Sequence, residues 1–440
     1  MTETTSKKRG LFSWYFGTNL LVRILVGLIL GGVVGITLGY FPEAAEKFVS
    51  YAKFFGDLFI RLLKMIVVPV IFFSLITGAA SIAPDKLGRI GAKTIFFYMA
   101  STLFAVGVGL GIATLFQPGA GLQITGSEGV AGRVAESPPI SQILLNIIPT
   151  NPVESLAKGD VLPIIFFAIV AGIALAILKE SKNETVAKQA NLVFDFCSGC
   201  AEIIYKLVGG IMQYAPIGVF VLIAIVFAQQ GPKVIGPLLF VTLAVYIALI
   251  LQMVICYGGL LSLNGLSFIK FLKGANEAMI TAFVTRSSSA TLPVSMRVAN
   301  ENLGVPPSIS SFALPIGATI NMNGTAIYIA ICAMFIGYAT GQPLTYSQQF
   351  TVMITATLAA IGTAGVPGAG ALMLIMALES IGLSLETGSA VAACYAMVLG
   401  IDALLDMGRT SMNVTGDVVG TVLVSKSEKS LDMDCWRSGK

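Results

Sequence analysis

The amino-acid sequence predicts an all-α polytopic membrane protein with eight transmembrane spans and two re-entrant helical hairpins. Its 440 residues are 55% hydrophobic and only 11% charged, whereas soluble domains carry about 25% charged residues. Long apolar runs recur along the chain, and several loops rich in Lys and Arg alternate with nearly neutral ones. Since a helical span needs about 20 apolar residues, the chain is long enough for eight of them.

Eight apolar runs are continuous enough to cross a bilayer as helices. They lie at about residues 18–41, 54–83, 92–116, 161–178, 203–228, 236–263, 309–340 and 387–424. The stretch between 117 and 160 is rich in Gly, Pro and Ser and too polar to span. We therefore expect surface loop and short helices in that stretch.

The distribution of basic residues predicts how the spans are oriented, because loops rich in Lys and Arg stay in the cytoplasm. Basic clusters lie near residues 7–9, 84–93, 179–188 and 270–273 and in the tail after 425. The loops at 117–130, 229–235 and 339–348 hold only one basic residue, Lys233. We expect a multi-pass protein of the plasma (cytoplasmic) membrane with both termini in the cytoplasm.

Two further apolar segments, at about 275–304 and 349–382, are broken by polar or Gly/Pro clusters. If both termini are cytoplasmic, each segment must enter and leave the membrane on the same side, so each is predicted to be a re-entrant hairpin. A hairpin followed by a span, repeated in the opposite orientation, is typical of the inverted repeats of secondary transporters. Irregular backbone at this depth is tolerated only where protein or a water-filled site satisfies it.

The last apolar run carries four ionisable residues on one helical face. Asp402, Asp406, Arg409 and Asp417, with Asn413 among them, fall within an arc of roughly 80° at about 100° per residue. Charged side chains at bilayer depth are costly and persist where they are paired, ligated or wetted. A structural Asp–Arg pair would still leave at least two Asp unpaired. Three Asp and one Arg give the stripe a formal charge of −2, which predicts cation binding.

Three other polar interruptions fall in the second half of the chain. The Ser-rich segment TRSSSATLP (285–293) offers hydroxyls and a helix N-terminus to a carboxylate. The Gly/Pro segment AAIGTAGVPGAGA (359–371) cannot continue a helix and lets backbone groups point at a ligand. Asn and carbonyl oxygens of NMNGT (321–325) suit a small cation. An ordinary turn, close packing of small residues and a polar helix contact are the alternative explanations.

Together these four pieces predict one site near the middle of the membrane that fits an amino acid. Asp would bind its ammonium group, hairpin amides its α-carboxylate and Arg409 a second carboxylate, and sodium would neutralise the remaining acids. The chain has no His, so it lacks the commonest general base. We expect no enzyme and no nucleic-acid partner. An ion channel built on the same stripe is an alternative.

The motifs TRSSSATLP, NMNGTA, IGTAGVPGAGA and GIDALLDMGRTSMNVTGD resemble signatures of the glutamate transporter family, the dicarboxylate/amino acid:cation symporters. The segments LFIRLLKMIVVPVIFFSLITGAASIAP and MQYAPIGVF are also similar to that family, especially to its prokaryotic sodium–aspartate members. The resemblance implies a homotrimer in the lipid bilayer that works by an elevator mechanism. The implied parts are a cytoplasmic N-terminus (1–17), a scaffold (18–83 and 120–235), a transport domain (84–119 and 236–424) and a cytoplasmic tail (425–440).

The resemblance also implies site residues. Asp406 would bind the α-amino group of the substrate, Arg409 a side-chain carboxylate, and Thr410 and Asn413 the α-carboxylate end. The full implied substrate set is Arg286, Ser288, Thr325, Val366, Gly370, Asp406, Arg409, Thr410 and Asn413.

Three sodium sites are implied in the same way. The first would use Gly317, Asn321, Asn413 and Asp417. The second would use carbonyl groups at Thr319, Ala360, Ile361 and Thr363. The third would use Tyr98, Ser101 and Thr102 with Asn321 and Asn323. The family pattern at the last position is usually NMDGT, and a Gln often stands where this chain has Ile329. The third site therefore lacks a carboxylate ligand.

The expected function is sodium-coupled symport of an acidic amino acid, aspartate or glutamate, with Na+ as the coupling ion. One alternative is a neutral amino acid, small or aromatic, carried with fewer sodium ions, which the changes at Asn323 and Ile329 motivate. The other alternative is a C4-dicarboxylate.

Overall fold

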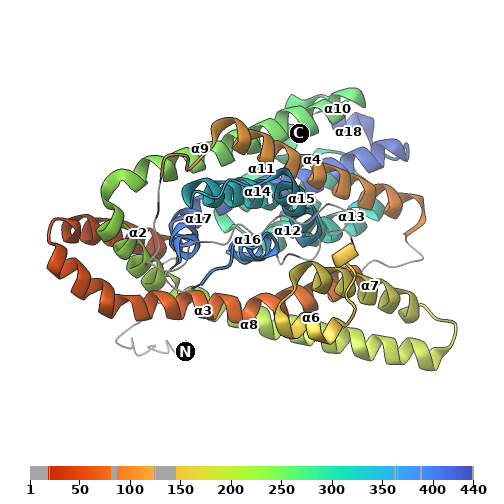
Figure 1. The fold of residues 1–440 in the computed structure, drawn as a ribbon. Helices are drawn as coiled ribbons and strands as arrows, with labels where there is room; N and C mark the ends of the chain where they lie inside the picture. The colour runs from red at the N-terminus through yellow and green to blue at the C-terminus, as the bar shows by residue number, and fades with distance from the viewer. Residues whose placement is uncertain are drawn as a thin grey trace, which may run out of the picture.

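The computed structural model describes residues 18, 20–80, 87–122, 124, 145–360, 363, 365–386 and 389–438. This part is almost entirely helical (Figure 1) and contains eight helical segments long and apolar enough to cross a membrane. The spans are α2 (Leu20–Gly39), α3 (Pro42–Ala80), α4 (Ala92–Phe116), α7 (Val161–Lys179), α8 (Glu184–Gln230), α9 to α10 (Ile235–Leu251, Gly259–Leu263), α13 with α14 (Pro307–Ile320, Asn323–Ala339) and α17 (Ala390–Ser427). The predicted polytopic all-α class is confirmed.

Helices α3 and α8 are longer than the apolar runs that predicted them. Helix α3 begins at Pro42 and α8 at Glu184, well before the runs at 54–83 and 203–228. Ala, Glu and Lys in the leading segments favour helix although they are not apolar enough to span. The polar stretch before α7 contains the short helix α6 (Pro152–Lys158), which Asn151 caps through its side chain.

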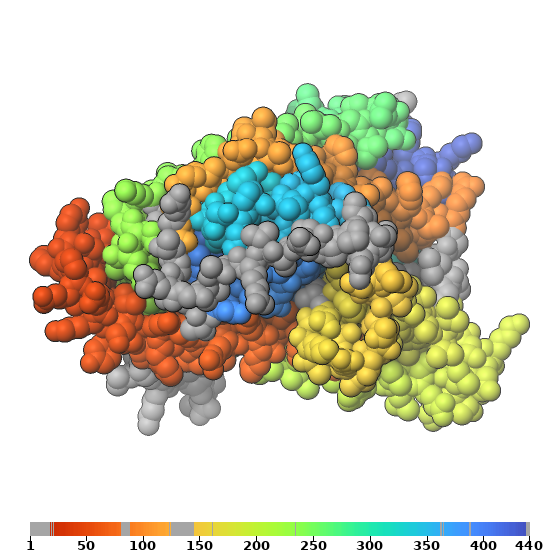
Figure 2. All heavy atoms as spheres, viewed as in Figure 1, coloured from red at the N-terminus to blue at the C-terminus, as the bar shows by residue number. Residues whose placement is uncertain are grey.

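Four helices, α2, α3, α7 and α8, pack against one another along one side of the molecule. Helix α2 lies so close to α8 that a Cβ added at Gly27, Gly31 or Gly35 would meet a backbone carbonyl oxygen of α8 at 2.4–2.5 Å. Small residues spaced four apart permit this approach between membrane helices. In the face shown in Figure 2, α3 (red) and the segment around α6 and α7 (yellow) flank the rest of the molecule.

The centre of the molecule is built from α14 and α17, which pack on each other and on α4, α11 and α13. The described span of α13 and α14 is buried along its whole apolar window. A helix that is apolar all round belongs inside a protein. Helices α14 and α17 lie in the middle of the ribbon (Figure 1), and their polar residues Asn323, Asp406 and Asp417 are buried.

Two pairs of shorter helices meet this centre. Helices α11 (Phe268–Thr285) and α12 (Ser288–Arg297) are joined by a two-residue turn, and α15 (Tyr346–Ala360) precedes α16 (Ala369–Ser380). The helices of each pair contact each other. At 10 and 12 residues, α12 and α16 are about 15 and 18 Å long, too short for a hydrocarbon core of about 30 Å.

Two local irregularities fall inside spans. Asn321 and Met322 separate α13 from α14, so the predicted interruption at NMNGT is confirmed. The π-helical turn η3 (Gln252–Gly258) interrupts the span between α9 and α10. Such turns are frequent at functional sites, and η3 brings Tyr257 to the interior of the molecule.

Candidate functional site

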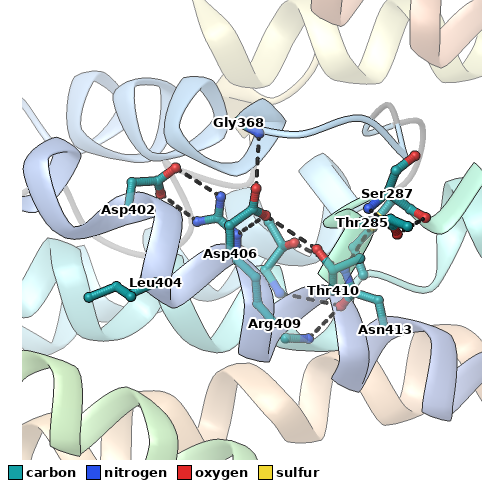
Figure 3. Close-up of polar contacts among 12 residues, drawn as sticks. Thr285, Ser287, Gly368, Asp402, Leu404, Asp406, Arg409, Thr410 and Asn413 are labelled. Carbon is teal, nitrogen blue, oxygen red and sulfur yellow. Dashed lines mark hydrogen bonds and ion pairs between the residues drawn. The ribbon is translucent and has the colours of Figure 1, made fainter. Parts of the chain in front are cut away.

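The polar stripe predicted on the last span lies on α17 and is buried. Asp402, Asp406, Arg409, Asn413 and Asp417 are each no more than 4% exposed. Ser389 begins the helix by accepting a hydrogen bond from the backbone N–H of Ala392. The labelled part of this stripe points toward the tips of the two short helix pairs (Figure 3).

Arg409 is held by two carboxylates of its own helix. Its Nη1 and Nη2 atoms lie 2.8 and 3.2 Å from the two carboxylate oxygens of Asp402, and its Nε lies 2.9 Å from Oδ1 of Asp406. The guanidinium group also lies over the ring of Tyr328, 4.3 Å from its centroid. A planar guanidinium has donors on both edges, so it can bind two carboxylates at once.

The expectation that at least two Asp of the stripe lack an ionic partner is therefore wrong. Asp402 and Asp406 both pair with Arg409, because positions three and seven residues before it lie on the same helix face. Within the described ranges, Asp417 is the stripe carboxylate without an ion pair. Its Oδ1 atom accepts a hydrogen bond from Nδ2 of Asn321 at 2.9 Å.

The tips of the two short helix pairs meet beside Asp406. Ser287 caps α12 through its side chain and donates to the carbonyl oxygen of Gly365 at 2.6 Å. The N–H of Gly368 donates to Oδ2 of Asp406 at 3.1 Å (Figure 3). Arg286, at the turn, adopts a left-handed backbone with φ 55°, which is uncommon for a residue other than Gly. The structure thus brings the Ser-rich and Gly/Pro motifs together on the stripe.

Eight of the nine predicted substrate residues line one small cavity. It leaves about 10 Å³ of free space, roughly the room of one water molecule. An amino acid therefore fits only after the tips have moved apart. The eight residues are Arg286, Ser288, Thr325, Val366, Gly370, Asp406, Thr410 and Asn413.

The ninth residue, Arg409, lies directly behind the cavity wall formed by Gly370. A Cβ added at Gly370 would lie 2.7 Å from Cζ of Arg409. The guanidinium group turns toward Asp402 rather than into the cavity (Figure 3). Sequence spacing allowed Arg409 to pair with either Asp402 or Asp406, and the structure shows both pairs.

Asn413 connects α17 to the broken helix. Its Oδ1 accepts from the N–H of Gly324 at 2.7 Å, and its Nδ2 donates to Oγ1 of Thr325 at 3.2 Å. Gly324 is required here, because an added Cβ would lie 2.3 Å from the carbonyl oxygen of Arg409. The close approach places the N-terminus of α14 against the centre of the stripe.

The residues of the first predicted sodium set lie near one another. Asn321 bonds Asp417, and a Cβ at Gly317 would lie 2.7 Å from Oδ1 of Asp417. Asn413 lies one helical turn before Asp417 and bonds Gly324.

The second predicted set is only partly within the described residues. Ile361 lies outside them, and Ala360 ends α15. Thr319 and Thr363 both line a wider cavity of about 620 Å³, which lies between α13, the tips, the C-terminal end of α3 and the first half of α8.

The third predicted set forms a hydrogen-bonded network around Asn323. Oγ1 of Thr102 donates to Oδ1 of Asn323 at 2.6 Å, and Nδ2 of Asn323 donates to Oγ of Ser101 at 3.0 Å and to the hydroxyl oxygen of Tyr257 at 2.7 Å. The hydroxyl of Tyr98 points instead to the carbonyl oxygen of Ala313. Sequence reasoning missed Tyr257, although a polar Gln and a Tyr within one apolar run were a usable signal.

Replacing Gly370 by Ala is expected to weaken binding of aspartate, the substrate expected from the sequence, at least tenfold. The new methyl group would push the guanidinium group of Arg409 from its carboxylate partners, and a charged hydrogen bond contributes about 1.5–3 kcal/mol. Calorimetric titration with aspartate measures the effect. Gly107→Ala is the matched control, because a Cβ at Gly107 of α4 meets nothing within 4 Å. Equal affinities of the two variants would contradict the placement of Arg409.

A helical bundle with apolar spans, a broken helix and a buried charged site at its centre defines a secondary transporter. The chain belongs to the sodium:dicarboxylate symporter family, whose model matches residues 20–427. The predicted resemblance is confirmed. The family is one of transporters, which agrees with the expectation that the chain is not an enzyme.

Relatives in bacteria cover nearly the whole chain. The chain is 35% identical to the proton/glutamate-aspartate symporter of Escherichia coli, with 94% of each chain aligned. It is 34% identical to the proton/sodium-glutamate symport protein of Geobacillus stearothermophilus, over 92% of this chain and 94% of the relative. It is also 34% identical to the C4-dicarboxylate transport protein of Rhizobium meliloti, over 98% of this chain and 94% of the relative. Together with the apolar spans, these relatives support a multi-pass protein of the inner membrane.

Proposed function

We propose that the protein is a sodium-coupled symporter of acidic amino acids, aspartate or glutamate. The observation that carries this proposal is Arg409, a buried cation at the wall of the cavity that already binds two carboxylates. A substrate carboxylate can replace one of these partners without leaving the guanidinium group unpaired. A neutral side chain supplies no further partner for Arg409, which would then keep only the two carboxylates of its own helix.

The other cavity residues supply the groups that an amino acid requires. Asp406 pairs with the α-ammonium group, while Thr410 and Asn413 hold the α-carboxylate end. Arg286, Ser288, Thr325, Val366 and Gly370 enclose the substrate. Because the cavity has room for about one water molecule, entry and release of an amino acid require the tips of the two helix pairs to move apart.

Sodium is proposed at two positions next to the substrate. The first is bounded by Gly317, Asn321, Asn413 and Asp417, where the carboxylate of Asp417 has no ionic partner among the described residues. The second uses carbonyl groups at Thr319, Ala360, Ile361 and Thr363. Oxygen ligands of this kind suit hard cations. Names of the relatives include both sodium and proton symporters, and the choice of sodium here rests on these oxygen-rich positions.

The proposed transport cycle is an elevator movement of the transport domain (84–119 and 236–424) along the scaffold (18–83 and 120–235). The ion pair of Lys64 on α3 with Glu379 on α16, at 3.4 Å, joins the two proposed domains. The cavity of about 620 Å³ lies at the end of α3 that precedes the basic loop 84–93. Basic loops face the cytoplasm, so we assign this arrangement to an inward-facing state.

Assembly and orientation complete the proposal. The scaffold helices expose large apolar side chains such as Phe54 and Phe196, which suit lipid or neighbouring subunits of a homotrimer. The basic loops support a cytoplasmic position for both termini.

Equilibrium binding tests the proposed substrate. Purified protein titrated with L-aspartate is expected to bind it in sodium chloride but not in choline chloride, and glutamate is expected to compete. If serine, alanine or succinate binds in sodium chloride and aspartate does not compete with it, the acidic amino-acid assignment is wrong.

One alternative has specific support. The C4-dicarboxylate transport proteins are as similar to this chain as one of the glutamate transporters is, and a C4-dicarboxylate would also pair with Arg409. It has no ammonium group to pair with Asp406, which favours the amino acid.

A further inference from the structure

The buried charged side chains of the candidate substrate and sodium sites can be counted. Within the described ranges, the structure buries six Asp, Glu, Lys or Arg side chains, and five of them lie at this site. The sixth, Arg23 on α2, donates to Gln213. The five are Asp402, Asp406, Asp417, Arg286 and Arg409. Three carboxylates and two guanidinium groups give the empty site a formal charge of −1.

The network around Asn323 adds no charge to this number. The two N–H bonds of its amide donate to Ser101 and Tyr257, and its oxygen accepts from Thr102. These are the hydrogen-bonding groups that an Asn side chain offers, and every partner is a neutral hydroxyl. The position is satisfied within the protein, and a cation there would have to break these bonds.

A closed site with a net charge crosses a low-dielectric membrane at a high cost in free energy. The favoured loaded form is the one in which the ligands cancel the charge of the protein. From the proposed function we infer that this form holds one monoanionic amino acid and two monovalent cations. The inference rests on that function and adds the charge class of the substrate and the number of coupling ions. When the site then returns empty, with no cation carried back, each cycle moves one net positive charge inward.

The requirement that the loaded site be electrically neutral also ranks the alternative substrates. A neutral amino acid with two cations would leave the site at +1. A dianionic C4-dicarboxylate with two cations would leave it at −1, so it would need a third cation. Protonation of the dicarboxylate to a monoanion restores neutrality, which predicts that its competition with aspartate increases as the pH falls.

The potential at which net flux stops measures the charge moved. Proteoliposomes hold equal sodium on both sides and tenfold more labelled aspartate inside, and a potassium gradient with valinomycin sets the voltage. For one charge per cycle, flux is expected to vanish at about −59 mV inside, because a tenfold gradient is balanced by about 59 mV for one charge. Zero flux near about −30 mV would indicate three cations and overturn the inference.

This experiment separates the inference from the proposed function. Absence of sodium-dependent aspartate uptake would reject the proposed function itself. If aspartate uptake depends on sodium but the net flux vanishes at a voltage other than about −59 mV, or at no voltage, only the charge balance is rejected. Electroneutral, sodium-driven uptake of succinate at alkaline pH would also reject it, because two cations with the dianion would leave the site at −1.

Asn323→Asp tests the link between buried charge and cation number. The added carboxylate is expected to bring in a third cation and to move the zero-flux potential from about −59 toward about −30 mV. Asn323→Ser adds no charge and is expected to keep the original potential, which is independent of the transport rate. If the Asp variant keeps the original potential up to alkaline pH, buried charge does not set the cation number.

Discussion

Arg409→Ala is expected to abolish aspartate and glutamate binding. The substitution leaves Asp402 and Asp406 buried without the cation that both bind, and it removes the group proposed for the side-chain carboxylate. Truncating one partner of a buried charge pair in a binding site costs about 2–5 kcal/mol, so affinity is expected to fall by at least about thirtyfold. Calorimetric titration with aspartate in sodium measures this loss.

Two controls separate binding from folding in this experiment. The double variant Arg409→Ala with Asp402→Asn removes one of the uncompensated carboxylates, so it is expected to regain thermal stability but not aspartate affinity. Arg297→Ala removes an Arg that pairs with Glu277 while 44% of its side chain is exposed, and exposed pairs contribute little. Unchanged aspartate affinity in the Arg409 variant would count against its proposed role.

Asp417→Asn is expected to remove most of the sodium dependence. Asp417 is 3% exposed, accepts a hydrogen bond from Asn321 and lies against Gly317. An amide at this position supplies no negative charge, so sodium affinity is expected to fall by roughly ten- to a hundredfold, the effect of losing about 1.5–3 kcal/mol. Aspartate binding measured across a series of sodium concentrations reports the change.

Thr415→Ala is the matched control for this prediction. Thr415 is buried on the same helix, but its hydroxyl donates to the backbone of Ser411 within the helix. The sodium dependence of aspartate binding in Thr415→Ala is expected to stay close to that of the unmodified protein. A sodium dependence that survives in Asp417→Asn would show that the first cation site lies elsewhere.

Periodicity in the sequence was sufficient to place the stripe of α17 and the spans, because both depend on local spacing. The break at NMNGT could be predicted for the same reason, since two Asn and a Gly interrupt an apolar helix. Helices α3 and α8 are longer than predicted because hydropathy marks the membrane-spanning part of a helix and not its ends.

The partners of the stripe could not be predicted, because they depend on tertiary contacts and on side-chain rotamers. Asp402 and Asp406 both lie within reach of Arg409 along the helix, and only the position of the guanidinium group shows that it binds both. The contact of Tyr257 with Asn323 joins segments 66 residues apart. The ring of Tyr328 beneath Arg409 comes from another helix as well.

Uptake of labelled L-aspartate into proteoliposomes with an imposed sodium gradient tests the central claim most directly. Accumulation is expected only when sodium is higher outside, and unlabelled glutamate is expected to suppress it while serine, alanine and succinate at neutral pH do not. The proposed function would be contradicted if aspartate did not accumulate under the sodium gradient and did not compete with another amino acid that accumulates.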